Sequence, residues 1–480
     1  MVGVGRRDRH ELGNEKREDG PTALNPRTRI NWTGLLSFPC LSACSPVAID
    51  DTDCAGSAAC RRQKPADLEP LTTYESLRTR PLIVLSFDAL TTSSLGCYGS
   101  SWNQTPSIDQ IASTGCVWDR WTSSDDQPHS LLRRLFTVGD DQVDGQSGDI
   151  ASQWMEPWKL AGETELITDV EAVASAASCF DSVVQMQASE NGMAATEIEQ
   201  THLASLMAAA IERDIETDGD WSLMWLHSDF LTRCWDAPRS LYPIDEVELQ
   251  SALEPWEEED LADTPDFGSL PLINESALVP KIDLTKAPSD SQSIGWLGDA
   301  YHPDAITMWM RTYACQVRLV DLMIEVMLQS LLCDDPRVLL IGTSGFGLGQ
   351  NQHIGHRVGP LRSHDLRLPM VVSDVGPVRM PHVTSDRSLP NILRSLGNND
   401  ASWCGAQAWT QSTKDKVVRT SSDRANHAIT ADEWLFVEDN DGSEHLYLKP
   451  DDVEDFNDVA RLRPSVIDEL KESPLPIDES

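Results

Sequence analysis

The sequence of 480 residues is short of basic side chains. It has 38 Lys and Arg against 77 Asp and Glu, which gives a net charge of −39. Duplex DNA and anionic membrane surfaces repel so acidic a chain, so we predict no nucleic-acid partner. The sequence has no run of about 18 apolar residues, so no membrane span is predicted. Its 11 cysteines form no Cys-x-x-Cys pair, which argues against a zinc ribbon or a thioredoxin-type site.

The overall composition is that of an ordinary globular protein, with 40% hydrophobic and 24% charged residues. We predict a poorly ordered leader over 1–79, a core domain over 80–400 and a small C-terminal subdomain over 401–480. Within the core, the stretch around 244–300 begins with many acidic residues and no basic one up to Asp263. Charge runs of one sign usually stay solvated, so this stretch is predicted to be an insertion loop.

The leader leaves the compartment open between two interpretations. Residues 41–44 have the letters of a bacterial lipoprotein signal box, ending at Cys44. The apolar stretch before them is short, is broken by Pro39 and begins far from Met1, unlike a normal signal peptide. One interpretation is a disordered leader on a cytoplasmic protein. The other is a cell-envelope protein whose start site is misassigned.

Short apolar runs alternate with helical patterns along the core. The runs that predict buried strands are 81–87, 221–226, 338–341 and 370–372. Helices are predicted after Thr105, over 196–214 and over 303–332. This alternation predicts an α/β fold with a mostly parallel central sheet flanked by helices, and a small C-terminal α+β region. In such folds ligands bind beyond the carboxyl ends of the strands, which directs attention to Asp88, His227 and the loop 342–349.

A series of short motifs runs in order along about residues 80–470. The motifs are Asp88-Ala-Leu, Leu95–Gly99, Thr105–Ala112, Gly115–Trp118, Trp225–His227, Trp235–Pro238, Thr343–Gly349, Leu366–Val372, Asp432–Phe436, Leu446-Tyr447 and Asp455–Ala460. Any single motif is weak, but the ordered set resembles that of the sulfatases of the alkaline-phosphatase superfamily. The resemblance implies an alkaline-phosphatase-like fold and a hydrolase acting on sulfuric ester bonds, in a divergent bacterial member of the family.

The resemblance also implies a divalent cation, calcium or magnesium, bound by one or two Asp after the first strand and by an Asp-Asn or Asp-His pair after the late strand. Asp88 stands at the first position and is the predicted metal ligand, but Ala89 follows it. The late pair is replaced by Gly345 and Phe346, which offer no side-chain ligand. We therefore predict no cofactor, and expect calcium or magnesium only if the metal site is retained.

The nucleophile of the resembling family is a Cys or Ser two residues before a proline. Aligned on Pro128, that position is Asp126, and the family's lysine falls near Val358, beside Arg357. The scaffold motifs thus persist without the expected metal ligands and nucleophile. We predict a sulfatase-like protein without standard metal-dependent activity, a pseudoenzyme. An unusual site that still hydrolyses an ester is the counter-hypothesis.

A different class of function, non-catalytic binding of a sulfated or other anion in the old cleft, stays open as the alternative. It rests on a basic, imidazole-rich segment in an acidic chain: His353, His356, Arg357, Arg362 and His364. Arginine suits sulfate, phosphate and carboxylate, so the expected partner is a small-molecule or saccharide anion. The candidate catalytic residues are Asp126, His227, His356 and Arg357. For Asp88 a strand-end turn, and for His227 a structural hydrogen bond, are equally consistent with the pattern.

Overall fold

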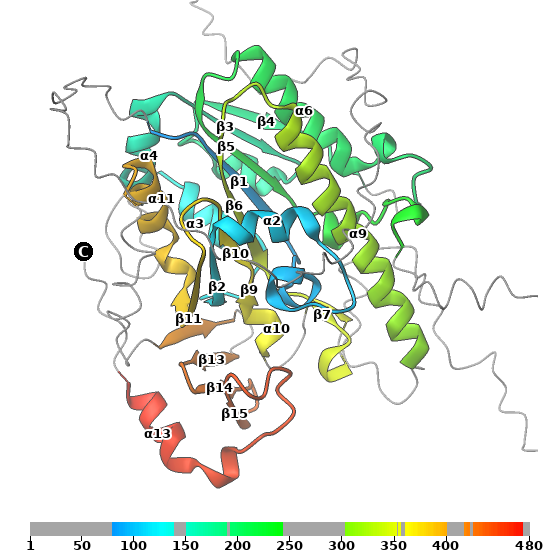
Figure 1. Ribbon diagram of the computed structural model, residues 1–480. Coiled ribbons are helices and arrows are strands. Elements are labelled where there is room, and N and C mark those ends of the chain that lie inside the picture. The colour runs from blue at the N-terminus through cyan, green and yellow to red at the C-terminus, as the bar shows by residue number, and fades with distance from the viewer. Residues whose placement is uncertain are drawn as a thin grey trace, which may run out of the picture.

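The computed structural model describes residues 79–138, 150–189, 193–242, 303–352, 354–356, 361–400, 417–422 and 426–473. The predicted leader up to residue 78, the acidic insertion, His353 and Arg357 lie outside the described residues. The described chain forms one large sheet with helices on both faces and a smaller antiparallel sheet at one end (Figure 1). Among the described helices, none is long and apolar enough to cross a bilayer.

The large sheet has the strand order β11-β2-β10-β6-β1-β5-β3-β4, with β9 paired to β2. Strands β6, β1, β5, β3 and β4 are mutually parallel, whereas β10 runs antiparallel to both of its neighbours, β6 and β2. The strands are β1 (Leu82–Asp88), β2 (Cys116–Thr122), β3 (Glu163–Thr168), β4 (Ser182–Gln185), β5 (Trp221–Ser228), β6 (Arg337–Ser344), β9 (Arg367–Leu368), β10 (Met370–Val372) and β11 (Val378–Ser385). The predicted mostly parallel sheet is confirmed.

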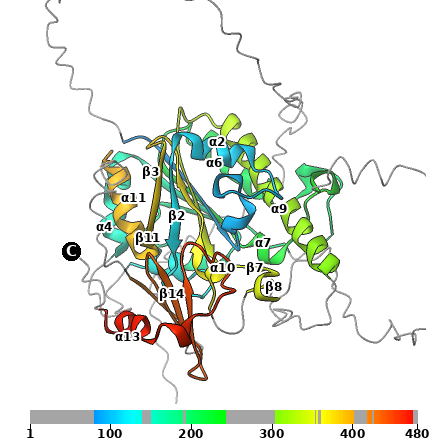
Figure 2. The ribbon, with the colours of Figure 1, turned by 60° about the horizontal axis from the view of Figure 1, so that its bottom comes forward.

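Strand β1 is buried on both faces because its side chains alternate between two apolar cores. Leu82 and Val84 join one core, and Ile83, Leu85 and Phe87 join the other. The core that contains Ile83, Leu85 and Phe87 is covered by α2 (Pro106–Thr114), α6 (His202–Glu216), α7 (Phe230–Arg233) and α9 (Pro303–Ser330). The opposite core is covered by α3 (Ser130–Phe136), α4 (Ile150–Ala161), α5 (Glu171–Ala176) and α11 (Leu389–Gly397). Figures 1 and 2 show these two helical layers on either side of the sheet.

The C-terminal region is a four-stranded antiparallel sheet with a helix packed on it. Its elements are β12 (Val418–Ser421), β13 (His427–Thr430), β14 (Trp434–Glu438), β15 (Glu444–Leu448) and α13 (Pro464–Glu472). The Arg120 guanidinium of β2 donates to the carbonyls of Ala431 and Asp432, and the Thr420 hydroxyl donates to the carbonyl of Ser123 at 2.6 Å. These contacts join the small sheet to the large one, and the predicted small α+β region is confirmed.

Helix α2 begins after Thr105 as predicted, but the Thr105 side chain does not cap it. The acceptor comes from α9 instead, since the Asp321 carboxylate accepts from the backbone N–H groups of Ser107 at 3.2 Å and Ile108 at 2.8 Å. Burial raises the pKa of Asp321 to about 6, although these two hydrogen bonds act in the opposite direction. A tertiary contact therefore satisfies the first turn of α2.

The raised pKa of Asp321 predicts a pH-dependent stability. The folded state binds more protons than the unfolded state between the unfolded pKa of 3.8 and the folded pKa of about 6, so stability falls as pH rises through this window. We expect the free energy of unfolding of the wild type to fall by up to about 3 kcal/mol relative to Asp321→Asn between about pH 4 and pH 7. Urea denaturation of both proteins at pH 4 and pH 7 measures these free energies of unfolding. If the wild type and Asp321→Asn differed in the free energy of unfolding by the same amount at both pH values, the prediction would be wrong.

Candidate functional site

Asp88 ends β1 at the carboxyl edge of the sheet, where the chain turns sharply. Its side chain is only 1% exposed, and its Oδ1 accepts a hydrogen bond from the Thr343 hydroxyl of β6. The next residue, Ala89, has a left-handed backbone with φ of 61°. The Tyr313 hydroxyl of α9 donates to the Ala89 carbonyl at 2.6 Å and so holds this turn in place. Asp88 is therefore fixed by its neighbours on β6 and α9.

His129 faces Asp88 from the loop before α3. Its backbone is also left-handed, with φ of 65°, and it is the residue that precedes the first turn of α3. The His129 Nδ1 lies 2.7 Å from Asp88 Oδ2, and the two side chains are 19% and 1% exposed. This contact is an ion pair, and neither of the two atoms has another hydrogen-bond partner within the described residues. Sequence reasoning did not select His129.

His227 completes the group from β5, the strand next to β1. Its ring is fully buried and lies edge-on to the ring of His129, with 5.6 Å between the ring centroids. The His227 Nδ1 lies 3.0 Å from the Ser86 hydroxyl, and its Nε2 has no hydrogen-bond partner among the described residues. One ligand atom from each of Asp88, His129 and His227 lies within 4.8 Å of the others.

The charges of the three groups follow from their surroundings. Burial raises the pKa of Asp88, but the charge of His129 and the Thr343 hydroxyl outweigh it and hold the pKa well below its usual range. Burial lowers the pKa of His129, yet the charge of Asp88 outweighs it, so the pKa lies above its ordinary value. Burial lowers the pKa of His227 to about 4. The site thus holds a carboxylate, an adjacent imidazole whose charged form is more favoured than in a free histidine, and an imidazole that is neutral at neutral pH.

The positions of the expected late metal ligands are filled by packing. Phe346 is fully buried and stacks on Trp309 and Tyr313 of α9, with ring centroids 5.7 Å apart in both cases. A Cβ added at Gly345 would lie 2.2 Å from the backbone oxygen of Asp365, so only glycine fits there. Calcium needs about six to eight oxygen ligands, and magnesium a near-octahedral oxygen set. One carboxylate beside two imidazoles does not fit either ion.

The other candidate residues that the structure describes are not members of this group. The Asp126 carboxylate accepts a hydrogen bond from the Gln127 side chain at 3.0 Å, and Asp126 is not part of the three-residue group. The His356 ring lies edge-on to Phe346, 5.5 Å away. Within the basic segment, the Arg362 guanidinium stacks on Tyr447 at 5.0 Å. The structure thus brings together Asp88 and His227 of the predicted residues, and Arg357 lies outside the described part of the chain.

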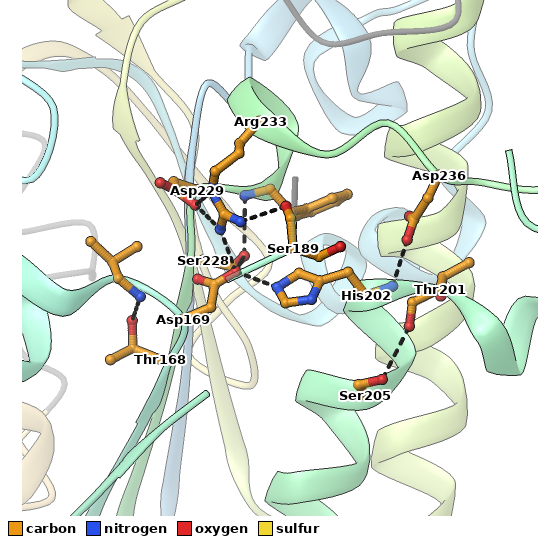
Figure 3. Close-up of polar contacts among 12 residues, drawn as sticks. Thr168, Asp169, Ser189, Thr201, His202, Ser205, Ser228, Asp229, Arg233 and Asp236 are labelled. Carbon is orange, nitrogen blue, oxygen red and sulfur yellow. Dashed lines mark hydrogen bonds and ion pairs between the residues drawn. The ribbon is translucent and has the colours of Figure 1, made fainter. Parts of the chain in front are cut away.

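A buried ion network borders the site at the carboxyl ends of β3 and β5. Asp169 Oδ2 accepts from His202 Nε2 at 2.6 Å, from the Ser228 hydroxyl at 2.8 Å and from the Arg233 guanidinium at 2.8 Å (Figure 3). Arg233 also pairs with Asp229. Burial raises the pKa of Asp169, but His202 and Arg233 outweigh it and hold the pKa below its usual range. The network fixes Ser228, the residue after His227.

A cavity of about 610 Å³ lies between the large sheet and the C-terminal sheet. Its basic lining residues are Arg120, Arg367, His382 and Lys449, and its acidic ones are Asp119 and Asp432. The basic groups are engaged, since Lys449 pairs with Asp455 and the His382 Nδ1 lies 3.1 Å from Asp432. The cavity therefore gathers four basic side chains beside two acidic ones, and at least two of the basic groups already have an acidic partner.

Solved structures share this fold. The chain is similar to a protein solved in complex with its substrate D-glucosamine-2-N,6-O-disulfate (TM-score 0.56, 15% identity), covering 82% of this chain and 97% of that one. It is similar to the phosphonate monoester hydrolase of Agrobacterium radiobacter (TM-score 0.56, 14% identity, 82% and 95%). It is also similar to a 2-O GAG sulfatase (TM-score 0.54, 11% identity, 82% and 90%).

These likenesses establish the class of fold. The chain shares its fold with solved sulfatases, as the order of sequence motifs indicated. Because the sequence identities are only 11–15%, these similarities indicate the fold and not the function. No model of a protein family and no curated protein matches the sequence.

Proposed function

We propose that this protein keeps the sulfatase fold but not the calcium-dependent ester hydrolysis of sulfatases. The observation that carries the proposal is the aromatic stack at Phe346, which fills a position where a cation ligand is expected. Gly345 beside it has no room for any side chain. A hard divalent ion that has lost several oxygen ligands is held too weakly to polarise a sulfate ester.

The nucleophile position supports the same proposal. Asp126 bonds to the neighbouring Gln127 and does not belong to the group around Asp88. A nucleophile needs an activating base or cation within hydrogen-bond reach. The fold is thus retained while the parts that activate and hold a sulfate ester are replaced.

A second candidate function is non-catalytic binding of an anionic saccharide. The cavity of about 610 Å³ favours it, because an otherwise acidic chain places Arg120, Arg367, His382 and Lys449 around one space. A fold neighbour was solved with a disulfated glucosamine, which makes a sulfated sugar the natural probe.

One experiment with the purified full chain tests both functions. We expect no calcium-dependent hydrolysis of an aryl sulfate, with an active sulfatase as positive control and chelator-treated protein as blank. The same protein is heated with and without D-glucosamine-2-N,6-O-disulfate, against sodium chloride at equal ionic strength. Stabilisation by the sugar without turnover supports the binder. Turnover that rises with calcium, and is lost in Asp88→Asn, would overturn the main proposal.

A further inference from the structure

Three buried side-chain atoms lie together at the carboxyl edge of the sheet: Asp88 Oδ2, His129 Nδ1 and His227 Nε2. The first two lie 2.7 Å apart and form an ion pair, whereas His227 Nε2 has no partner among the described residues. A buried polar atom nearly always has a partner, because desolvation without compensation costs about 1–3 kcal/mol. One ligand atom from each of the three residues lies within 4.8 Å of the others, so a single group bound among them would also give His227 Nε2 its partner.

The hydrogen bonds of Ser86 determine which nitrogen of His227 carries the proton. The Ser86 hydroxyl donates to the Leu226 carbonyl at 3.2 Å and accepts from the Trp225 indole N–H at 2.8 Å. A hydroxyl has one proton and two lone pairs, so the remaining lone pair accepts from His227 Nδ1 at 3.0 Å. The Nε2 of His227 therefore carries a free lone pair directed away from Ser86.

We propose that Asp88, His129 and His227 form a binding site for a single divalent transition-metal ion of the zinc class. Imidazole nitrogens suit zinc and its neighbours in the first transition row, whereas calcium and magnesium prefer oxygen. Three protein ligands leave a fourth position open for water or an anion, as in catalytic zinc sites. The site shares Asp88 with the cation site that the resemblance implies, but its other two ligands are the imidazoles of His129 and His227. It does not depend on the proposed loss of sulfatase chemistry.

The distances suit this ion. Ligand atoms of a tetrahedral zinc site lie roughly 3.3 Å apart, because zinc binds nitrogen and oxygen at about 2.0–2.2 Å. The 2.7 Å between Asp88 and His129 and the 4.8 Å limit for the group bracket that separation. Because 2.7 Å is shorter than the separation of two ligands, a bound ion would replace the ion pair and move His129 Nδ1 away from Asp88 Oδ2.

The residues behind the ligands hold them as a metal site requires. Metal-binding histidines usually donate their other ring N–H to a second group, as His227 does to Ser86. The carboxylate of Asp88 is oriented in turn by the Thr343 hydroxyl on its other oxygen. Both supporting residues, Ser86 and Thr343, lie in strands of the sheet.

The test is titration of the untagged full chain with zinc chloride by calorimetry and with cobalt chloride by absorption spectroscopy. We expect one ion per chain at this site and a four-coordinate cobalt spectrum rather than that of the hydrated ion. The variant His129→Gln is expected to bind on the order of 100-fold more weakly, and Ser86→Ala about 10-fold more weakly.

The matched control is His445→Gln. His445 Nδ1 lies 2.9 Å from an oxygen of Asp458, so it forms a similar imidazole–carboxylate pair, but it is not part of a three-ligand group among the described residues. This variant should bind zinc as the wild type does. Because the His129 side chain is partly exposed, we expect His129→Gln to fold, and circular dichroism is the check of this. Wild-type affinity and an unchanged cobalt spectrum in His129→Gln would overturn the proposal, as would a wild type that binds neither ion.

Discussion

A double variant with Gly345→Asp and Phe346→His, the pair expected in a sulfatase, is expected to fail to fold rather than to regain a cation site. Loss of the fully buried Phe346 ring from its stack on Trp309 and Tyr313 costs about 3–5 kcal/mol. A side chain at Gly345 collides with the Asp365 backbone, which adds a further penalty. Together these losses approach the whole stability of a typical domain, about 5–15 kcal/mol.

Soluble yield and thermal unfolding followed by circular dichroism measure this effect. The matched control is Phe346→Leu, which keeps the position apolar and should lower stability by only about 1.5 kcal/mol. The packing argument is wrong if the double variant melts at the wild-type temperature. It is also wrong if added calcium stabilises the double variant.

The second large effect is expected from Asp169→Ala in the buried ion network. Its Oδ2 accepts from His202, Ser228 and Arg233, so the substitution removes the acceptor of three donors at once. The Arg233 guanidinium keeps Asp229, but the buried His202 ring loses its charged partner. Breaking such a buried pair costs about 3–5 kcal/mol, because a desolvated group is left without its partner.

Urea denaturation of Asp169→Ala beside Lys471→Gln separates buried from exposed ion pairs. Lys471 pairs with Glu438 at 3.0 Å and Glu444 at 2.6 Å on the surface, so its substitution should cost no more than about 1 kcal/mol. Equal losses in the two variants would show that the Asp169 network adds little to the stability. Because Ser228 follows His227, we also expect Asp169→Ala to weaken metal binding, if the fold survives.

The central strands could be predicted from the sequence because they are buried on both faces. The runs around 82–88, 221–228 and 337–344 have apolar centres and are almost wholly buried, and each ends in one or more polar residues at the same edge of the sheet. The direction of β10 could not be predicted, because an apolar run of three residues has the same pattern in parallel and antiparallel pairing. The cap of α2 also escaped prediction, since Asp321 comes from a distant helix.

The candidate site was predicted in two of its three residues. Asp88 and His227 end neighbouring parallel strands, so the topology alone brings them together. His129 lies in a loop, next to the Pro128 on which the nucleophile position was aligned, and attention fell on Asp126 instead. Its approach to Asp88 depends on a left-handed backbone at His129, which no local pattern indicates. The position of His129 directly after Pro128 was the only feature of the sequence that could have drawn attention to it.

The Ser86 hydroxyl has a consequence for proton exchange. It lies inside β1 with no exposed surface, and the His227 Nδ1 proton points at it from the neighbouring strand. Water reaches this proton only when β1 and β5 separate, so its exchange with deuterium follows the opening of the sheet rather than the motion of the ring. The exchange rate of a single imidazole N–H thus reports how often the buried strands β1 and β5 separate.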